Sequence, residues 1–119
     1  MRPRKPAPAD EIPKGALRAV VLSLLSEKPL HGYAIVQALK LRTGGALELK
    51  EGSLYPALHE LELEGFVDAH WEKSPEGRKR RVYSITPRGR RETSAWRDRW
   101  LAMAELLKSL LARPSTARS

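Results

Sequence analysis

The stretch GSLYPALHELELEGFV at residues 52–67 contains one short amphipathic helix and the start of a strand. Leu54, Leu58 and Leu61 recur at the spacing that places side chains on one face of a helix. Ser53 is available as an N-terminal cap, and Gly65 suits the end of the helix. We therefore predict a helix over 52–65 with one buried face and one free face.

The segments around this helix complete a small fold. Apolar residues at helical spacing predict helices over 13–26 and 31–42, followed by a brief extended piece at 47–49. Two segments rich in β-branched and aromatic residues, 66–71 and 80–85, flank the turn sequence SPEG at 74–77 and predict a β-hairpin. Three helices followed by a hairpin are typical of a winged helix-turn-helix, whose third helix enters the DNA major groove.

The chain divides into four parts on this basis. Residues 13–86 form the winged helix-turn-helix domain, and a long helix follows over 87–112, capped by Thr86 and begun by Pro87. Residues 1–12 are expected to be a flexible basic arm, and residues 113–119 a disordered tail. In the arm, Arg2, Arg4 and Lys5 could contact phosphate, although a solvated tail is the simpler interpretation. The predicted fold class is mainly α with a small β-hairpin.

The charge balance indicates a polyanion as the partner. The 119 residues include 22 Lys and Arg against 14 Asp and Glu, a formal net charge of +8. This excess favours nucleic acid, and the longest apolar run is too short for a membrane span. The chain has no cysteine, and no signal peptide is recognisable, so we expect a cytoplasmic protein.

Neither a metal site nor an enzyme is expected. His31, His59 and His70 lie on separate predicted elements without the spacing of metal ligands. The sequence has no glycine-rich phosphate loop and no nucleophile elbow. We predict no metal, no cofactor and no catalytic residue.

Four residues near the start of the 52–65 helix are candidates for DNA contact: Ser53, Tyr55, Pro56 and His59. Ser and His can bond base edges or phosphate, and Tyr can bond phosphate or pack on a sugar. The alternative is that Tyr55 belongs to the core and Ser53 is only a cap. Glu60, Glu62 and Glu64 make the back half of this helix acidic, so that half should point away from phosphate.

The hairpin can supply the electrostatic attraction that this helix lacks. Between Lys73 and Arg91 there are eight basic residues against one acidic residue, Glu76. Arg78, Lys79 and Arg80 lie nearest the tip and are the expected phosphate or minor-groove contacts. Trp71 and Tyr83 are expected to pack the hairpin onto the helices.

The sequence His31-Gly32-Tyr33 opens the second helix. Backbone N–H groups at a helix start, with His31 and Tyr33 beside them, can bind a phosphate. The alternative is that Tyr33 is a packing residue and that Gly32 gives room to a neighbouring helix.

The final helix carries a heptad seam formed by Trp96, Trp100, Met103, Leu107 and Leu110. A domain of this size cannot bury the whole stripe by itself. A second copy of the chain is the simplest partner, which predicts a twofold dimer and paired DNA half-sites.

Three longer strings resemble the PadR family of winged-helix transcription regulators. They are LLSEKPLHGYAI at residues 24–35, GSLYPALHELELEGFV at 52–67 and RVYSITPRG at 81–89. The resemblance covers about residues 14–112. It implies a homodimer that represses genes by binding a palindromic operator and is released by an effector, and it places Tyr33 close to the DNA backbone.

The resemblance also bears on the two tryptophans of the final helix. Some relatives hold flat aromatic drugs between tryptophans at the dimer interface, so Trp96 and Trp100 are a candidate site for a planar aromatic effector. The alternative is that both are interface core. For the whole chain we predict a sequence-specific DNA-binding transcriptional regulator. A winged-helix protein-interaction module that pairs through its final helix is the alternative.

Overall fold

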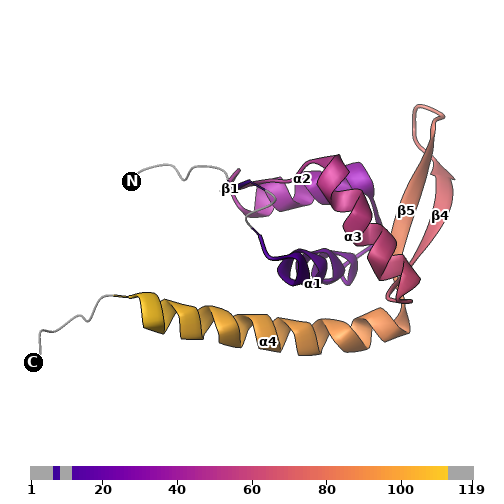
Figure 1. Cartoon of the computed structure of the whole chain (residues 1–119). Helices are drawn as coiled ribbons and strands as arrows, with labels where there is room; N and C mark the ends of the chain where they lie inside the picture. Colours follow the sequence, from indigo (N-terminus) through magenta and orange to yellow (C-terminus); the bar gives the residue numbers. More distant parts are fainter. Residues whose placement is uncertain (1–6, 9–11, 113–119) are drawn as a thin grey trace, which may run out of the picture.

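The computed structural model describes residues 7–8 and 12–112, and Figure 1 shows their arrangement. The helices and strands, in chain order, are β1 (Ala7–Pro8), α1 (Lys14–Leu25), β2 (Leu30–His31), α2 (Gly32–Arg42), β3 (Leu47–Glu48), α3 (Glu51–Leu63), β4 (Val67–Lys73), β5 (Lys79–Ile85) and α4 (Pro87–Leu111). The mainly helical winged-helix fold with a small hairpin, predicted from the sequence, is confirmed. Arg2, Arg4, Lys5 and the tail at 113–119 lie outside the described residues.

The core lies where α1, α2 and α3 meet. Its fully buried side chains include Leu22, Ile35, Leu54, Leu58 and Leu61. Burying an aliphatic side chain of this size stabilises a fold by about 2 kcal/mol. The apolar face predicted for the third helix is therefore the face that holds the three helices together.

A three-stranded antiparallel sheet in the order β2-β5-β4 flanks the helices. Its long arm is the β4–β5 hairpin, the wing, which projects from the helices in Figure 1. The turn of the wing is closed by the Ser74 N–H donating to the Arg78 carbonyl at 2.7 Å, and Gly77 supplies the positive φ of 84°. Tyr83 in β5 is paired with both Leu30 and Ala69, which ties the wing to the helical core.

Two local features differ from the sequence predictions. The cap of α3 is Lys50 without a side-chain hydrogen bond, so Ser53 lies inside the helix and the prediction of a Ser53 cap is wrong. The helix begins earlier because the Lys50 carbonyl accepts from the N–H groups of Ser53 and Leu54. Within the segment expected to be a flexible arm, Ala7–Pro8 forms β1, parallel to β3.

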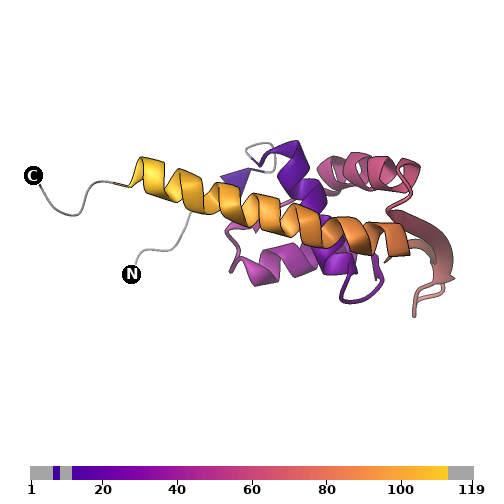
Figure 2. The ribbon, with the colours of Figure 1, turned by 90° about the horizontal axis from the view of Figure 1, so that it is seen from below.

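Helix α4 starts at the base of the wing, lies along α1 and continues past the other helices, as Figures 1 and 2 show. The predicted cap is confirmed, since Thr86 Oγ1 accepts from the Gly89 N–H at 3.0 Å and Pro87 begins the helix. The Thr86 hydroxyl also donates to the Gly65 carbonyl at 2.6 Å. A Cβ at position 89 would overlap the carbonyl oxygen of Phe66, so glycine sets how closely α4 approaches the end of α3.

Candidate nucleic-acid interface

The free face of α3 carries the four side chains that the sequence nominated. Ser53, Tyr55, Pro56 and His59 are all exposed, whereas the opposite face is buried in the core. Packing therefore leaves polar and aromatic groups free on this helix, as a helix that reads base edges requires.

Tyr55 combines the two roles considered for it. Its ring lies against the first residue of α2, where a Cβ at position 32 would come within 2.5 Å of the Tyr55 hydroxyl oxygen. The ring nevertheless remains 41% exposed. Burial and the neighbouring Glu51 carboxylate, to which the Tyr55 hydroxyl donates at 3.5 Å, raise the pKa of Tyr55. The absence of a side chain at Gly32 thus allows the Tyr55 ring to pack against the start of α2.

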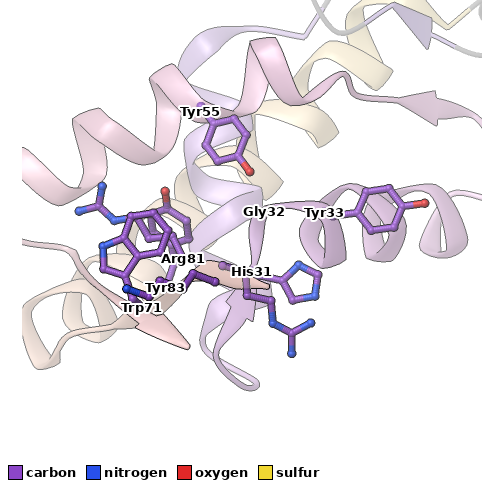
Figure 3. Close-up of a pocket in the computed structure, with 9 residues that line it drawn as sticks. His31, Gly32, Tyr33, Tyr55, Trp71, Arg81 and Tyr83 are labelled. Carbon is purple, nitrogen blue, oxygen red and sulfur yellow. The ribbon is translucent and has the colours of Figure 1, made fainter. Parts of the chain in front are cut away.

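The start of α2 is capped by a histidine. His31 Nδ1 accepts from the Ala34 N–H at 3.3 Å, so one of the N–H groups expected to bind a phosphate already has a partner. Burial and the Arg80 charge lower the pKa of His31, which favours the neutral ring that the cap requires. Tyr33, two residues after His31, is 55% exposed, and Figure 3 shows its ring pointing away from Tyr55.

The wing presents cations and one aromatic ring. Arg78 and Lys79 are exposed, and Arg80 is partly covered. Tyr83 is buried, which confirms its predicted packing role. Trp71 is 65% exposed, so the prediction that it packs onto the helices is wrong. The strand β4 is exposed from His70 onward, where the wing projects from the helices, and the Arg81 guanidinium lies 5.9 Å from the centroid of the indole.

An open pocket of about 480 Å³ joins these elements (Figure 3). It lies between the start of α2, the free face of α3 and the wing. The lining residues are His31, Gly32, Tyr33, Tyr55, Trp71, Lys79, Arg80, Arg81 and Tyr83. Four predicted DNA-binding residues meet here: Tyr33, Tyr55, Lys79 and Arg80. The other four, Ser53, Pro56, His59 and Arg78, do not line it.

Two pocket residues, Trp71 and Arg81, had not been nominated as DNA contacts. They face each other across the wing. In a strand, alternate side chains share one face, so the pairing of β4 with β5 was the signal that could have placed Trp71 beside the cations.

The acidic half of α3 is neutralised inside the subunit. Glu60 accepts from Lys14 at 2.7 Å, Glu64 pairs with Arg18, and Glu62 accepts from Arg81 at 2.9 Å. The Lys14 hydrogen bond lowers the pKa of Glu60. The pairing reduces the repulsion that three carboxylates would exert on a nearby phosphate chain.

Not all eight basic residues of the wing region are free for DNA. Arg81 is paired with Glu62, Arg88 lies over the Phe66 ring at 5.3 Å, and Arg90 donates to the Ser26 carbonyl at 3.2 Å. Fewer basic side chains are therefore available to DNA than the sequence suggested, and those that remain are concentrated toward the tip of the wing.

The heptad stripe of α4 divides into two halves. Trp96 meets Phe66 edge-on at 5.4 Å, with the Arg18 guanidinium 5.4 Å from its ring centroid, and Trp100 lies against Gly15. Met103, Leu107 and Leu110 are exposed by 44%, 46% and 69%. The subunit thus covers much of both tryptophans and leaves the distal half of the predicted dimer interface bare.

The part of the chain that the structure describes lacks a metal-binding cluster and a membrane-spanning helix. Its His, Asp and Glu side chains do not gather into a group of three or more that could hold a metal ion. Its helices are also too short or too polar to cross a bilayer.

Comparisons with known proteins agree with this architecture. The profile of the transcriptional regulator PadR-like family matches residues 21–95. The transcriptional regulator Rv3488 of Mycobacterium tuberculosis is 33% identical over 88% of this chain and 92% of its own length. A transcriptional regulator from Clostridium thermocellum has a similar structure, with a TM-score of 0.76 and 26% identity over 87% of this chain and 97% of that chain.

A third comparison concerns the fold alone. Bacillus subtilis PadR, solved in complex with operator DNA, superposes with a TM-score of 0.63 at 24% identity, covering 90% of this chain and 55% of that chain. Members of the family are winged-helix transcriptional regulators and not enzymes. On the profile match and the identity to Rv3488, this chain belongs to the PadR-like family of transcriptional regulators.

Proposed function

We propose that this regulator is a homodimeric repressor that binds a palindromic operator sequence-specifically. The observation that carries the proposal is the pocket in which Tyr33 of α2, Tyr55 of α3 and Lys79 and Arg80 of the wing converge. Cations and hydroxyl groups from three elements around one open groove suit a sugar-phosphate strand. The operator-bound state of the B. subtilis neighbour supports the same use of the fold.

The proposed division of labour follows from the charges. The wing cations attract the duplex by releasing counterions, which gives affinity for any sequence. Ser53, Pro56 and His59 lie on the exposed face of α3 and read base edges in the major groove. Sequence preference and salt dependence therefore reside on different elements and can be removed separately.

The distal half of α4 provides the twofold partner surface. Met103, Leu107 and Leu110 form an exposed apolar stripe that a second copy of the same stripe would cover. Two copies of α3 then face two half-sites, and repression follows when the bound dimer excludes polymerase from the promoter.

A gel shift tests the central claim. Binding to the duplex upstream of the regulator's own gene is compared with binding to a random duplex at matched salt. A preference of about tenfold or more supports sequence-specific regulation. Equal binding to both, or none, would favour the interaction module that pairs through α4. In footprinting, a palindromic operator gives protection symmetrical about one centre.

The salt dependence tests the wing. Replacing Arg78 and Arg80 by Ala should weaken binding to all sequences and flatten the slope of log K against log salt by about one unit per lost phosphate contact. An unchanged slope would remove the wing cations from the interface. A matched control is Arg42→Ala, which removes an exposed cation on α2 that pairs with Glu27.

Release by a planar aromatic effector at Trp96 and Trp100 is the remaining part of the proposal. Because Trp96 packs on Phe66 within the subunit, Trp100→Ala is the gentler variant for testing a ligand site. Isothermal titration with planar aromatic cations should give heat with the wild type and less heat with Trp100→Ala. The absence of heat from all of them would contradict the effector site.

A further inference from the structure

The wing carries an exposed tryptophan, Trp71, on the same face as Lys73, Lys79 and Arg81. The strand register pairs Ala69 with Tyr83, Trp71 with Arg81 and Lys73 with Lys79, so these side chains share one face of the hairpin. The face changes from buried at Tyr83 to charged at the tip. Trp71 lies at the transition and is 65% exposed. A large apolar ring in such a place is typical of a binding contact rather than of a core.

The indole is held in place although it is exposed. The Arg81 guanidinium lies 5.9 Å from the ring centroid and donates to Glu62 of α3 at 2.9 Å. Trp71 is therefore linked through Arg81 to the helix that reads the major groove. A ring that is already ordered loses little conformational freedom on binding.

We propose that the face of the Trp71 indole packs on a deoxyribose of the DNA strand that runs between α3 and the wing. The inference rests on the proposed function. With α3 in the major groove and the wing along the backbone, one sugar-phosphate strand passes between them, and the pocket that holds Trp71 opens at this place (Figure 3). Lys79, which shares the face of Trp71, binds a phosphate next to that sugar.

A sugar is favoured over a base or a phosphate for two reasons. Trp71 lies within β4 and not in the turn between Lys73 and Lys79, which is the part of the wing that reaches farthest. Arg81 beside it is neutralised by Glu62 and is a weak partner for phosphate. An apolar contact to a sugar carries no sequence information and displaces no counterion.

These properties give the contact its own signature in binding experiments. Wild type, Trp71→Ala, Trp71→Phe and Lys79→Ala are titrated with a duplex of mixed sequence at several salt concentrations. Trp71→Ala should weaken binding about tenfold at every salt concentration and leave the salt slope unchanged, as expected for lost apolar contact. Lys79→Ala should flatten the slope by about one unit. Trp71→Phe should keep most of the affinity, since it retains an aromatic face.

Leu63→Ala is the matched control, because it removes an apolar side chain that is 73% exposed and lies at the C-terminal end of α3, away from the pocket. It should bind as the wild type does. A Trp71→Ala variant with unchanged affinity, or with a flattened slope, would overturn the inference. If the wild type bound no duplex, both the proposed function and the sugar contact would be refuted. DNA binding without an effect at Trp71 would remove only the sugar contact.

Fluorescence quenching tests the same contact in the wild-type protein, so a loss of stability caused by a substitution does not affect the result. Trp71 is the most exposed of the three tryptophans, so acrylamide quenches it readily in the free protein. Duplex should protect a component of the emission that is missing from Trp71→Phe. Equal quenching with and without duplex would contradict the packing of a sugar on the indole.

Discussion

The two halves of α4 have the same apolar stripe but different surroundings. In the proximal half, Trp96 packs on Phe66 and Trp100 lies against Gly15 of the same subunit. In the distal half, Met103 and Leu107 are nearly half exposed. A regular stripe therefore shows which face of a helix is apolar, but it does not show which molecule covers that face.

The proximal half of α4 therefore contributes to the folding of the subunit, and the distal half is free to contribute to the association of two subunits. Substitutions in the proximal half should act on the stability of the subunit, and those in the distal half on the association of two subunits. Three experiments test this division, and a fourth tests an ion pair between α1 and α3 of the same subunit.

The largest effect is expected from Leu107→Lys. A twofold interface places the new charge twice in an apolar seam, which should weaken dimerisation on the order of a thousandfold, about 4 kcal/mol. Sedimentation velocity should show a monomer at micromolar concentration, and circular dichroism should show a folded subunit. The matched control is Leu101→Lys, because Leu101 is 60% exposed and lies off the stripe. Equal effects of the two variants would refute the seam, and loss of the fold would refute the division.

A smaller effect is expected from Trp96→Ala. Removing the ring leaves a cavity between Phe66 and Arg18, which should lower the free energy of unfolding by about 3 kcal/mol. The measurement is urea denaturation in the Leu107→Lys background, where dissociation does not contribute. Leu110→Ala in the same background is the control and should change little, since Leu110 is 69% exposed. A similar loss for both variants would show that the distal half also packs within the subunit.

Arg18→Met tests the polar side of the proximal contact. The Arg18 guanidinium lies over the Trp96 ring and pairs with Glu64. Methionine keeps the apolar stem, so the expected loss is only about 1 kcal/mol, from the cation–π contact. Urea denaturation measures the loss, and the part of it that comes from the cation–π contact should disappear when Trp96→Ala is already present. Additive losses would mean that Arg18 and Trp96 act independently.

The smallest effect concerns pH. The Lys14 hydrogen bond lowers the pKa of Glu60 below its usual value of 4.5, so the folded subunit releases this proton more readily than the unfolded chain does. The stabilisation is complete above about pH 4.5 and is lost as the pH falls through the folded pKa. Lys14→Ala should make the urea midpoint less sensitive to acid in this range. An unchanged acid dependence would show that the exposed pair contributes nothing.

Local patterns predicted which face of α3 stays exposed, for an identifiable reason. The spacing of Leu54, Leu58 and Leu61 determines which face of α3 is buried, so the exposure of Tyr55 and His59 follows from the sequence. Trp71 was misplaced because its exposure depends on where the wing leaves the helices. No neighbouring residue in the sequence carries that information.

The caps show the same contrast on a smaller scale. Thr86 and Pro87 were predicted correctly because both signals act within one helical turn. Ser53 was predicted as a cap and lies inside α3, because the Lys50 carbonyl is positioned by the chain entering from the core at Leu49. Tertiary placement overrides a local preference of about 1 kcal/mol.

The sequence by itself determined the order of helices and strands, the apolar face of each helix and the excess of positive charge, because these depend on periodicity and composition. Tertiary structure alone decided which carboxylates neutralise which cations, that Tyr55 packs on Gly32, that Trp71 stays uncovered and that the α4 stripe is shared between its own subunit and a free surface. These outcomes depend on distances between residues far apart in the chain, and side-chain packing sets those distances only when the whole domain has folded.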